Sequence, residues 1–362
     1  IARTPIKKYQ SIKNKIAPDG RLHGALIYCG AARTGRWASG GVNFQNLPRP
    51  SIDDTESCID LFKHRDPELL EMLYDDTLEA LSSSIRGMVS ASSGKRLIIA
   101  DYSAIEARVL AWVADQEDVL EVFRGDGKIY EHTASQIYDK PVKDISKPER
   151  FLGKVATLAL GYQGGVRAFQ VMAENYGKEI KEEDAEKIKS SWRERNKNIV
   201  QLWGIAQDTA LSAVRHPGKG FVVKKMLRFK VEDNFLCIRL PSGRQLAYYD
   251  PEIEEGKYGN DQVSYMGTNT YTRKWERLST YGGKLVENII QAISRDLMAE
   301  AMLRVESAGY PLILTVHDEL VAEVDENLGS LEEFCRLICV LPGWAKGLPI
   351  TADGFECKRY RK

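Results

Sequence analysis

Two aspartates occupy matching positions in the sequence and could together hold metal ions. Asp101 follows the apolar run 96–100 (RLIIA), and Asp318 comes shortly after the run 311–316 (PLILTV). If the two runs are neighbouring strands, the carboxylates can bridge two Mg²⁺ ions about 3.5–4 Å apart, an arrangement that serves phosphoryl transfer. Placement alone favours a simpler interpretation, in which each Asp caps a turn.

Four residues spaced by four could form a second functional element. Arg150, Lys154, Leu158 and Tyr162 would lie along one face of a helix over roughly 18 Å. The two cations could bind a triphosphate, while Leu158 and Tyr162 could pack against a base and its sugar. The alternative is a solvated basic stripe with the Leu and Tyr in the core, and the spacing by itself leaves it open.

The sequence resembles family A DNA polymerases, the bacterial DNA polymerase I family, in four segments. Residues 101–108 (DYSAIEAR) resemble motif A, 150–162 (RFLGKVATLALGY) motif B and 316–319 (VHDE) motif C. Residues 34–36 (TGR) with 43–48 (NFQNLP) resemble the segment that contacts the minor groove of the primer-template. The four segments occur in the order of the family, and the resemblance covers essentially the whole chain.

The resemblance implies a two-metal catalytic site. Asp101 and Asp318 would hold two Mg²⁺ ions, for which Mn²⁺ can substitute, with the main-chain carbonyl of Tyr102 as a further ligand. Glu319 would support the site from beside it. Lys154 would act as the proton donor to the leaving pyrophosphate.

The resemblance also implies a nucleotide site and a DNA interface. Arg150 and Lys154 would bind the β and γ phosphates of the deoxynucleotide, Leu158 would stand at the sugar, and Tyr162 would stack at the templating position. Glu106 would be the steric gate that excludes the 2′-hydroxyl of a ribonucleotide. The DNA contacts would come from Arg36, Asn43, Gln45, Gln291 and His317, of which His317 would lie at the primer terminus.

The elements that must position these residues can be predicted from hydrophobic periodicity. We expect a strand at 96–101 that passes into a helix from 105, and almost wholly helical structure from 117 to 215. A hairpin is expected at 235–249, a long helix from about 284 to 308, and two strands at 311–316 and 319–324 joined by a tight turn. The chain would then have a sheet to which both of its ends contribute.

These elements predict an α+β fold, and the resemblance implies that it has the right-hand architecture of a polymerase. An antiparallel palm sheet would carry a large helical fingers insertion, and most of the thumb would be absent from this chain. We predict a first part of the palm at 1–113, with the end of the thumb, the fingers at 114–280, and a second part of the palm at 281–362. The acidic stretch 52–81 is longer than the usual connection of the family and is predicted to be an insertion.

Three positions depart from the family pattern. Leu158 replaces the usual Phe or Tyr that packs on the sugar, which puts dideoxynucleotide acceptance in question. Tyr130 stands where many relatives have a phosphate-binding His, and His132 is out of phase. Glu287 stands where relatives often have Asn, although Asn288 is adjacent.

Composition excludes several other classes of protein. The chain has 362 residues, 43% hydrophobic and 28% charged, which is ordinary for a globular protein with a large core. It has no apolar run long enough for a membrane span and no signal-like start, so no membrane partner and a cytoplasmic location in a bacterial or phage-infected cell are expected. Six cysteines form no CxxC pair, and Cys335 and Cys339 are interpreted as core residues of a helix.

The formal net charge is zero but the charge is unevenly distributed. Residues 1–50 hold nine Lys or Arg against one Asp, whereas residues 51–90 hold ten Asp or Glu against three basic residues. The basic block could contact phosphates, and a solvated surface remains the alternative. The expected partners are primer-template DNA, deoxynucleoside triphosphates, and upstream thumb and exonuclease domains or chains.

The sequence therefore predicts a template-directed DNA polymerase that extends a primer 3′ end and releases pyrophosphate. A single-subunit RNA polymerase is the nearest alternative, and Glu106 argues against it. A catalytically inactive DNA-binding scaffold is the second, and the paired Asp101 and Asp318 argue against it because clustered carboxylates without metal repel each other. A two-metal nuclease would have no use for the phosphate-binding helix.

Overall fold

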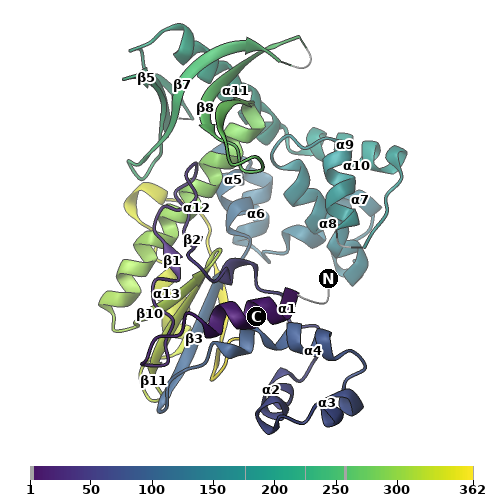
Figure 1. Cartoon of the computed structure of the whole chain (residues 1–362). Coiled ribbons are helices and arrows are strands. Elements are labelled where there is room, and N and C mark those ends of the chain that lie inside the picture. Colours follow the sequence, from purple (N-terminus) through teal and green to yellow (C-terminus); the bar gives the residue numbers. More distant parts are fainter. Residues whose placement is uncertain (1–3, 176, 225, 257–258, 362) are drawn as a thin grey trace. The chain divides into compact units, whose positions relative to one another are not determined.

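The chain folds into two compact units, as the computed structural model in Figure 1 shows. The structure describes residues 4–175, 177–224, 226–256 and 259–361. The first unit consists of residues 1–103, 298–340 and 351–362, and the second of residues 104–297 and 341–350. The assignment of palm and fingers to particular ranges stays a prediction.

A four-stranded antiparallel sheet forms the centre of the first unit. Its strands, in spatial order, are β10 (Leu312–Val316), β11 (Glu319–Asp325), β3 (Lys95–Tyr102) and β12 (Ala352–Cys357). Strand β3 comes from the first third of the chain and the other three from its last quarter, so both ends contribute to one sheet, as expected. Strand β12 was not predicted.

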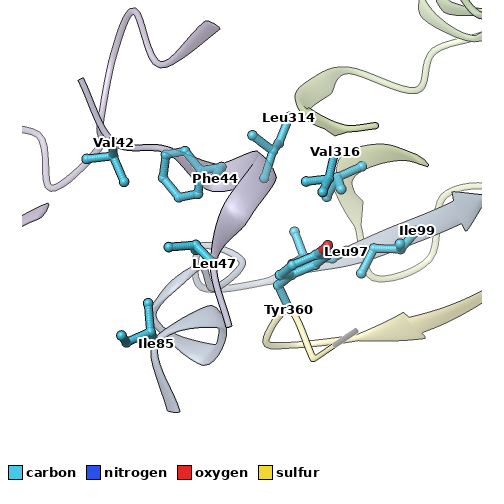
Figure 2. Packing of buried hydrophobic residues seen from close by; sticks show 10 residues of the cluster. Val42, Phe44, Leu47, Ile85, Leu97, Ile99, Leu314, Val316 and Tyr360 are labelled. Atoms are coloured by element: carbon cyan, nitrogen blue, oxygen red, sulfur yellow. The ribbon is translucent and has the colours of Figure 1, made fainter. Parts of the chain in front are cut away.

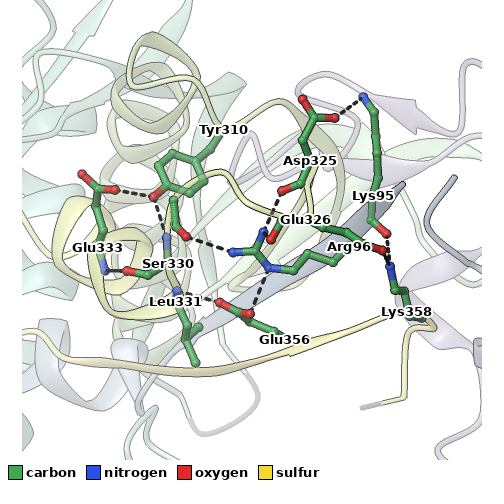
Figure 3. A network of polar contacts seen from close by, with 11 residues as sticks. Lys95, Arg96, Tyr310, Asp325, Glu326, Ser330, Leu331, Glu333, Glu356 and Lys358 are labelled. Atoms are coloured by element: carbon green, nitrogen blue, oxygen red, sulfur yellow. Dashed lines mark hydrogen bonds and ion pairs between the residues drawn. The ribbon is translucent and has the colours of Figure 1, made fainter. Parts of the chain in front are cut away.

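Arg96 connects the start of β3 to the neighbouring strands by hydrogen bonds and an ion pair. Its guanidinium forms an ion pair with Glu356 of β12 (2.9 Å) and donates to the main-chain carbonyls of Asp325, Glu326 and Gly329 at 2.7–2.9 Å. Figure 3 shows this network together with the Tyr310–Glu333 hydrogen bond of the same unit. These bonds fix the register of β3, and the register decides which residues stand opposite Asp101.

One core packs the N-terminal segment onto this sheet. Figure 2 shows Phe44 and Leu47 lying against Leu314 and Val316 of β10, with Tyr360 beside them. Burial of such apolar side chains contributes about 25 cal/mol per Å² removed from water. The segment with the NFQNLP motif is therefore held on the same strand that leads to Asp318.

The remaining elements of the first unit are short. They are α1 (Thr4–Lys13), β1 (Leu26–Ile27), β2 (Ala38–Ser39), η1 (Phe44–Asn46), α2 (Thr55–His64), α3 (Pro67–Leu73), α4 (Thr77–Ser84), η2 (Arg86–Met88) and α13 (Leu331–Ile338). The acidic stretch 52–81 forms α2, α3 and most of α4. Each of these three helices begins at an Asp whose side chain accepts main-chain N–H groups: Asp54, Asp66 and Asp76. Part of the acidic charge of this stretch thus serves helix capping.

The second unit combines a helical body with a second sheet. Its helices are α5 (Ile105–Ala114), α6 (Glu117–Arg124), α7 (Ile129–Tyr138), η3 (Val142–Asp144), α8 (Lys147–Leu160), α9 (Val166–Glu174), α10 (Glu182–Arg195), α11 (Lys197–Arg215) and η4 (Gly343–Ala345). The antiparallel sheet runs in sequence order through β4 (Phe221–Val223), β5 (Leu227–Glu232), β6 (Phe235–Arg239), β7 (Gln245–Glu255), β8 (Asp261–Thr268) and β9 (Trp275–Thr280). The predicted helical stretch and the hairpin are confirmed, and the sheet extends further along the chain than predicted.

A long helix, α12 (Gly282–Ser307), contributes residues to both units. Its bounds agree with the predicted helix. Gly309 follows it with φ +90°, a conformation in which glycine is favoured, and the chain then enters β10. No helix in the described ranges combines the length and apolar character that a membrane crossing requires.

Candidate active site

The register of the first sheet brings acidic residues together at one end of β3. Asp101 stands opposite Glu319 of β11 and opposite Asp353 of β12, so the three residues form one cross-strand row. Asp353 was not singled out from the sequence, and its carboxylate accepts a hydrogen bond from Ser103 (2.9 Å). The two apolar strands that lead to Asp101 and Asp318, β3 and β10, belong to the same sheet, but they are not direct neighbours because β11 lies between them.

Asp318 lies in the two-residue turn between β10 and β11. His317, the other turn residue, has φ +56°, and such positive φ values suit the tight hairpins that connect antiparallel strands. The main-chain carbonyl of Asp318 accepts from the N–H of Tyr102 (3.4 Å), which ties the turn to the end of β3. The turn thus holds Asp318 beside the end of β3, where Asp101 is the last residue but one.

Gln45 stabilises this turn with both ends of its side-chain amide. Its nitrogen donates to the carbonyl of Thr315 (3.1 Å), and its oxygen accepts from the N–H of His317 (2.5 Å). A role for Gln45 at the DNA minor groove would require the amide to leave these bonds. Of the other predicted DNA contacts in this unit, Asn43 is exposed and Arg36 is half-buried.

Glu319 is held by a buried network that the sequence analysis did not predict. Glu319 is 3% exposed and accepts a hydrogen bond of 2.6 Å from the hydroxyl of Tyr360, which is itself 2% exposed. The guanidinium of Arg86 donates to that hydroxyl (3.3 Å) and to the carbonyls of Leu47 and Pro48 at 2.8 and 3.0 Å. Tyr360 and Arg86 therefore fix the direction of the Glu319 carboxyl.

These groups line a single pocket of about 340 Å³ in the first unit. Its lining consists of Gln45, Asn46, Leu47, Arg49, Arg86, Asp101, Val316, His317, Asp318, Glu319 and Tyr360. Desolvation of the ring, together with the charge of Arg36 and then of Arg86 and Arg49, holds the pKa of His317 below its usual value. A lowered pKa favours the neutral imidazole, which can donate or accept a hydrogen bond at this pocket.

The oxygen donors of this pocket fit a hard divalent cation. The carboxylates of Asp101 and Asp318 are oxygen ligands that line the pocket, and the Oδ1 atom of Asp101 is buried. Tyr102, whose carbonyl was predicted as a further ligand, is 2% exposed and is not one of the lining residues. Within the described ranges, no group of three or more His, Cys, Asp or Glu side chains is gathered closely enough to enclose a metal ion. Mg²⁺ commonly binds one or two carboxylates together with substrate phosphates and waters, so the residues present remain compatible with it.

In the second unit, α8 begins with a capping box. Ser146 and Glu149 exchange hydrogen bonds, and Lys140 pairs with the Glu149 carboxylate. These contacts, with Lys140 the largest contributor, lower the pKa of Glu149 to about 2. Gly153 allows α7 to approach closely, because a Cβ there would lie 2.1 Å from the carbonyl of Tyr130. The start and the position of α8 are thus set by local sequence.

The predicted face of α8 is the face that the unit leaves accessible. Arg150 is exposed, and Lys154, Leu158 and Tyr162 are half-buried, whereas Gly153, Val155, Ala156, Ala159 and Leu160 are buried. The alternative in which the Leu and Tyr belong to the core does not match this burial. Tyr130 of α7 lies beside both cations, with its ring centre 5.3 Å from the Arg150 guanidinium carbon and 6.0 Å from Lys154 Nζ.

Arg150 also has a carboxylate partner in α7. Its Nε atom forms an ion pair of 2.7 Å with Glu131. His132, one residue further, pairs with Asp126 at 3.2 Å. Tyr130, at the position where the resemblance implies a His, therefore lies beside the predicted phosphate-binding cations, whereas the nearest His, His132, pairs with Asp126.

Tyr162 and Glu106 are in direct contact. The hydroxyl of Tyr162 donates to the Glu106 carboxylate (3.1 Å). Tyr162 was expected on the same helix as Arg150, but α8 ends at Leu160, so this bond links the turn after α8 to the first turn of α5. The turn at Tyr162 is fixed by Trp203, which donates to the carbonyl of Gly161 (3.0 Å), and by Gln163, which accepts from Gly283 of α12 (2.9 Å). Glu106, predicted to exclude ribonucleotides, and Tyr162, predicted to occupy the templating position, are thus joined by a hydrogen bond.

On α12, Gln291 is half-buried and its amide donates to Glu287 (3.3 Å). Asn288 is buried and donates to the hydroxyl of Tyr248 (3.0 Å), so it is engaged within the unit. Gln291 and Glu287 are the accessible polar pair of this helix segment.

The model of DNA polymerase family A matches residues 3–215 of the chain, more than half of its length. The chain belongs to this family. A DNA polymerase of Bacillus phage SP02 is 42% identical over the whole chain, and the chain covers 56% of that protein. DNA polymerase I of Pseudomonas aeruginosa is 26% identical over 91% of the chain and 28% of its own length.

A solved structure of the same family has a similar fold. This structure is the polymerase domain of Pol1 from M. smegmatis in complex with DNA primer-template and dNTP. The alignment covers 99% of the present chain and 51% of the Pol1 chain, with a TM-score of 0.65 and 20% sequence identity. The predicted α+β polymerase fold is thereby confirmed. The chain spans about half the length of the phage polymerase and of the solved chain.

Proposed function

We propose that this chain adds deoxynucleotides to the 3′ end of a primer on a DNA template and releases pyrophosphate. The observation that carries the proposal is the cross-strand row at the end of β3, with Asp101 opposite Glu319 and next to the turn that holds Asp318. Phosphoryl transfer depends mainly on positioning and charge neutralisation, and a rigid set of carboxylates on a sheet is suited to both.

Asp101, Asp318 and the carbonyl of Tyr102 would hold two divalent cations, Mg²⁺ or, in its place, Mn²⁺. When bound, such ions stabilise the attacking and leaving oxygens of an in-line displacement. Glu319 would keep the carboxylate row in place, since its own carboxyl is directed by Tyr360 and Arg86. His317 would contact the primer strand near its terminus.

The accessible face of α8 would bind the incoming deoxynucleotide. Arg150 and Lys154 would neutralise the β and γ phosphates, and Lys154 would donate a proton to the departing pyrophosphate. Leu158 would pack on the sugar. Arg150 would have to exchange its ion pair with Glu131 for the phosphates, so the Glu131 carboxylate can hold the guanidinium in position until the nucleotide arrives.

Glu106 would exclude ribonucleotides by filling the space that a 2′-hydroxyl needs. Its hydrogen bond to Tyr162 supports this role, because the bond restrains the carboxylate and couples it to the templating position. Arg36, Asn43 and Gln291 would contact the primer-template, and Gln45 would join them only after its amide leaves the β10–β11 turn.

A primer-extension assay tests the proposal. A labelled primer on a DNA template is incubated with the protein, Mg²⁺ and either deoxy- or ribonucleoside triphosphates, with EDTA as the control. We expect extension with deoxynucleotides that EDTA abolishes. Extension with ribonucleotides alone would identify an RNA polymerase, and binding without any extension would identify an inactive scaffold.

A further inference from the structure

The sheet of the second unit has one face that the unit covers and one that it does not. Along β5, β6 and β7 buried apolar residues alternate with accessible ones, and α11 packs against strands β4 to β8. The accessible set includes Arg228 and Lys230 on β5, Phe235 and Arg239 on β6, and Tyr249 on β7. None of these residues has a part in the proposed polymerase reaction.

Two arginines are directly opposed on this accessible face. Arg228 and Arg239 are cross-strand partners, and Gln245 is the next residue in the same row. Neither arginine forms an ion pair with a described residue, and the one acid that lines the adjacent pocket of about 140 Å³, Glu232, pairs with Lys230. Like charges opposite each other destabilise a sheet, and an anion bound between them would remove the repulsion.

Aromatic side chains continue the same face beyond the arginines. Phe235 and Tyr249 are cross-strand partners with ring centres 5.1 Å apart, and Trp275 lies 6.3 Å from Tyr249. Tyr249 is 40% exposed and Trp275 60% exposed. The loop before Trp275 adds Tyr271, which is 94% exposed, and it also carries two exposed basic residues.

The two groups are separated by a distance that a short strand of nucleic acid can span. Phe235 and Arg239 are four residues apart on β6, which corresponds to roughly 13 Å. Aromatic rings on which bases stack, next to cations that follow the backbone, are the combination that binds single strands without regard to sequence. An acidic peptide would use the arginines but has no use for the exposed rings of Tyr249 and Trp275 beside them.

We propose that the accessible face of β5–β7, together with Trp275, binds single-stranded DNA. Bases stack on Tyr249 and Trp275, and the phosphates pair with Arg228 and Arg239. This surface is a binding site additional to the proposed polymerase reaction and needs neither a nucleotide nor a metal ion. Its failure would therefore leave the proposed function intact.

Two labelled probes of equal charge separate stacking from simple charge attraction. One is oligothymidylate of about 12 nucleotides, within the usual range of single-strand sites. The other is an abasic strand of the same length. Binding of each to the whole chain is measured by fluorescence anisotropy without nucleotide or metal, with excess unlabelled blunt duplex present to occupy duplex-binding surfaces.

Two double variants test the two groups of residues. Tyr249→Ala with Trp275→Ala should lower the affinity for oligothymidylate at least fivefold, because the bases lose the rings on which they stack. The affinity for the abasic strand should stay nearly unchanged. Arg228→Glu with Arg239→Glu should weaken both probes at least tenfold and lower the salt slope by roughly 1.4, as expected for two phosphate contacts on a single strand.

Matched controls remove the same kinds of side chain elsewhere in the unit. Arg167→Glu reverses an exposed charge on α9, and Tyr138→Ala removes a partly exposed ring on α7. Both should bind the probes like the unaltered chain. Circular dichroism checks that every variant is folded, and extension of a primer by one nucleotide should stay unchanged in all of them.

Three results would overturn the proposal. The first is unchanged oligothymidylate binding in both double variants. The second is a loss of oligothymidylate affinity in the control variants as large as the loss in the double variants. The third is equal affinity of the unaltered chain for the abasic strand and for oligothymidylate, which would show that the arginines bind polyanions in general or an acidic protein.

Photocrosslinking of a 5-iododeoxyuridine strand to Tyr249 or Trp275 would support the proposal directly.

Discussion

Replacing Tyr360 with Phe removes one hydroxyl from the network that directs Glu319. The ring can keep its packing against the N-terminal segment and β10 (Figure 2), so the change isolates the 2.6 Å hydrogen bond to a carboxylate that is 3% exposed. A hydrogen bond to a charged group contributes about 1.5–3 kcal/mol to stability. We expect the free energy of unfolding to fall by an amount in that range.

The chain offers a matched control in the same unit. Tyr310, also 2% exposed, donates a 2.6 Å hydrogen bond to Glu333 and accepts one from the N–H of Ser330 (3.2 Å), and none of these three residues lines the pocket (Figure 3). Glu333 is much more accessible to solvent than Glu319, so Tyr310→Phe should cost less, about 0.5–1.5 kcal/mol. Urea unfolding of both variants gives the two free energies.

The two variants should differ in catalysis. If Tyr360 directs Glu319 for the carboxylate row, Tyr360→Phe should slow single-nucleotide extension roughly tenfold, the lower end of the effects seen for residues that support metal ligands. Tyr310→Phe should extend the primer at the normal rate. Normal extension by Tyr360→Phe, measured where both variants are fully folded, would refute the reasoning that the direction of Glu319 matters.

Three further predictions concern the second unit. Glu106→Ala should admit ribonucleotides in primer extension and lose some rate because Tyr162 is released, and unchanged selectivity would place the discrimination elsewhere. Leu158→Tyr should raise dideoxynucleotide use relative to the deoxynucleotide in pre-steady-state incorporation, and an unaltered ratio would remove Leu158 from the sugar site. Glu149, whose pKa is about 2 because of Lys140 and the helix start, stabilises the fold above its ordinary pKa of 4.5 and loses that effect as pH falls toward 2. The difference in melting temperature between the unaltered chain and Glu149→Gln should therefore shrink across that pH range, and a constant difference would contradict the assignment.

The elements that carry the site were predicted best where a hydrophobic pattern runs directly into a residue of the motifs. The strands that lead to Asp101 and to the turn with Asp318 were predicted because each is a short apolar run, and the structure places them in one sheet with β11 between them. Helix α12 was predicted within two residues because a long amphipathic pattern is followed by Gly309. Arg150, Lys154 and Leu158 share one face of α8, as a spacing of four requires, but the spacing left open whether that face is accessible or buried, and the structure shows that it is accessible.

Other features could not be predicted from local patterns. Strand β12 lies at the edge of its sheet and alternates only between accessible and half-buried residues, so its apolar period is weak. Tyr360 stands in a charged segment, and its bond to Glu319 joins residues 41 positions apart. Gln45 was assigned to DNA by resemblance, but the structure directs its amide to Thr315 and His317, a contact across about 270 residues.

The central claim is that Asp101 and Asp318 hold the catalytic metals, and one paired measurement tests it most directly. Primer extension and primer-template affinity are measured in the same Mg²⁺ buffer for Asp101→Ala, Asp318→Ala and the unaltered chain. We predict that both variants lose extension and bind the primer-template nearly as well as the unaltered chain, because the metals act in the transition state and DNA contacts lie elsewhere. Substantial extension by either variant would contradict the claim.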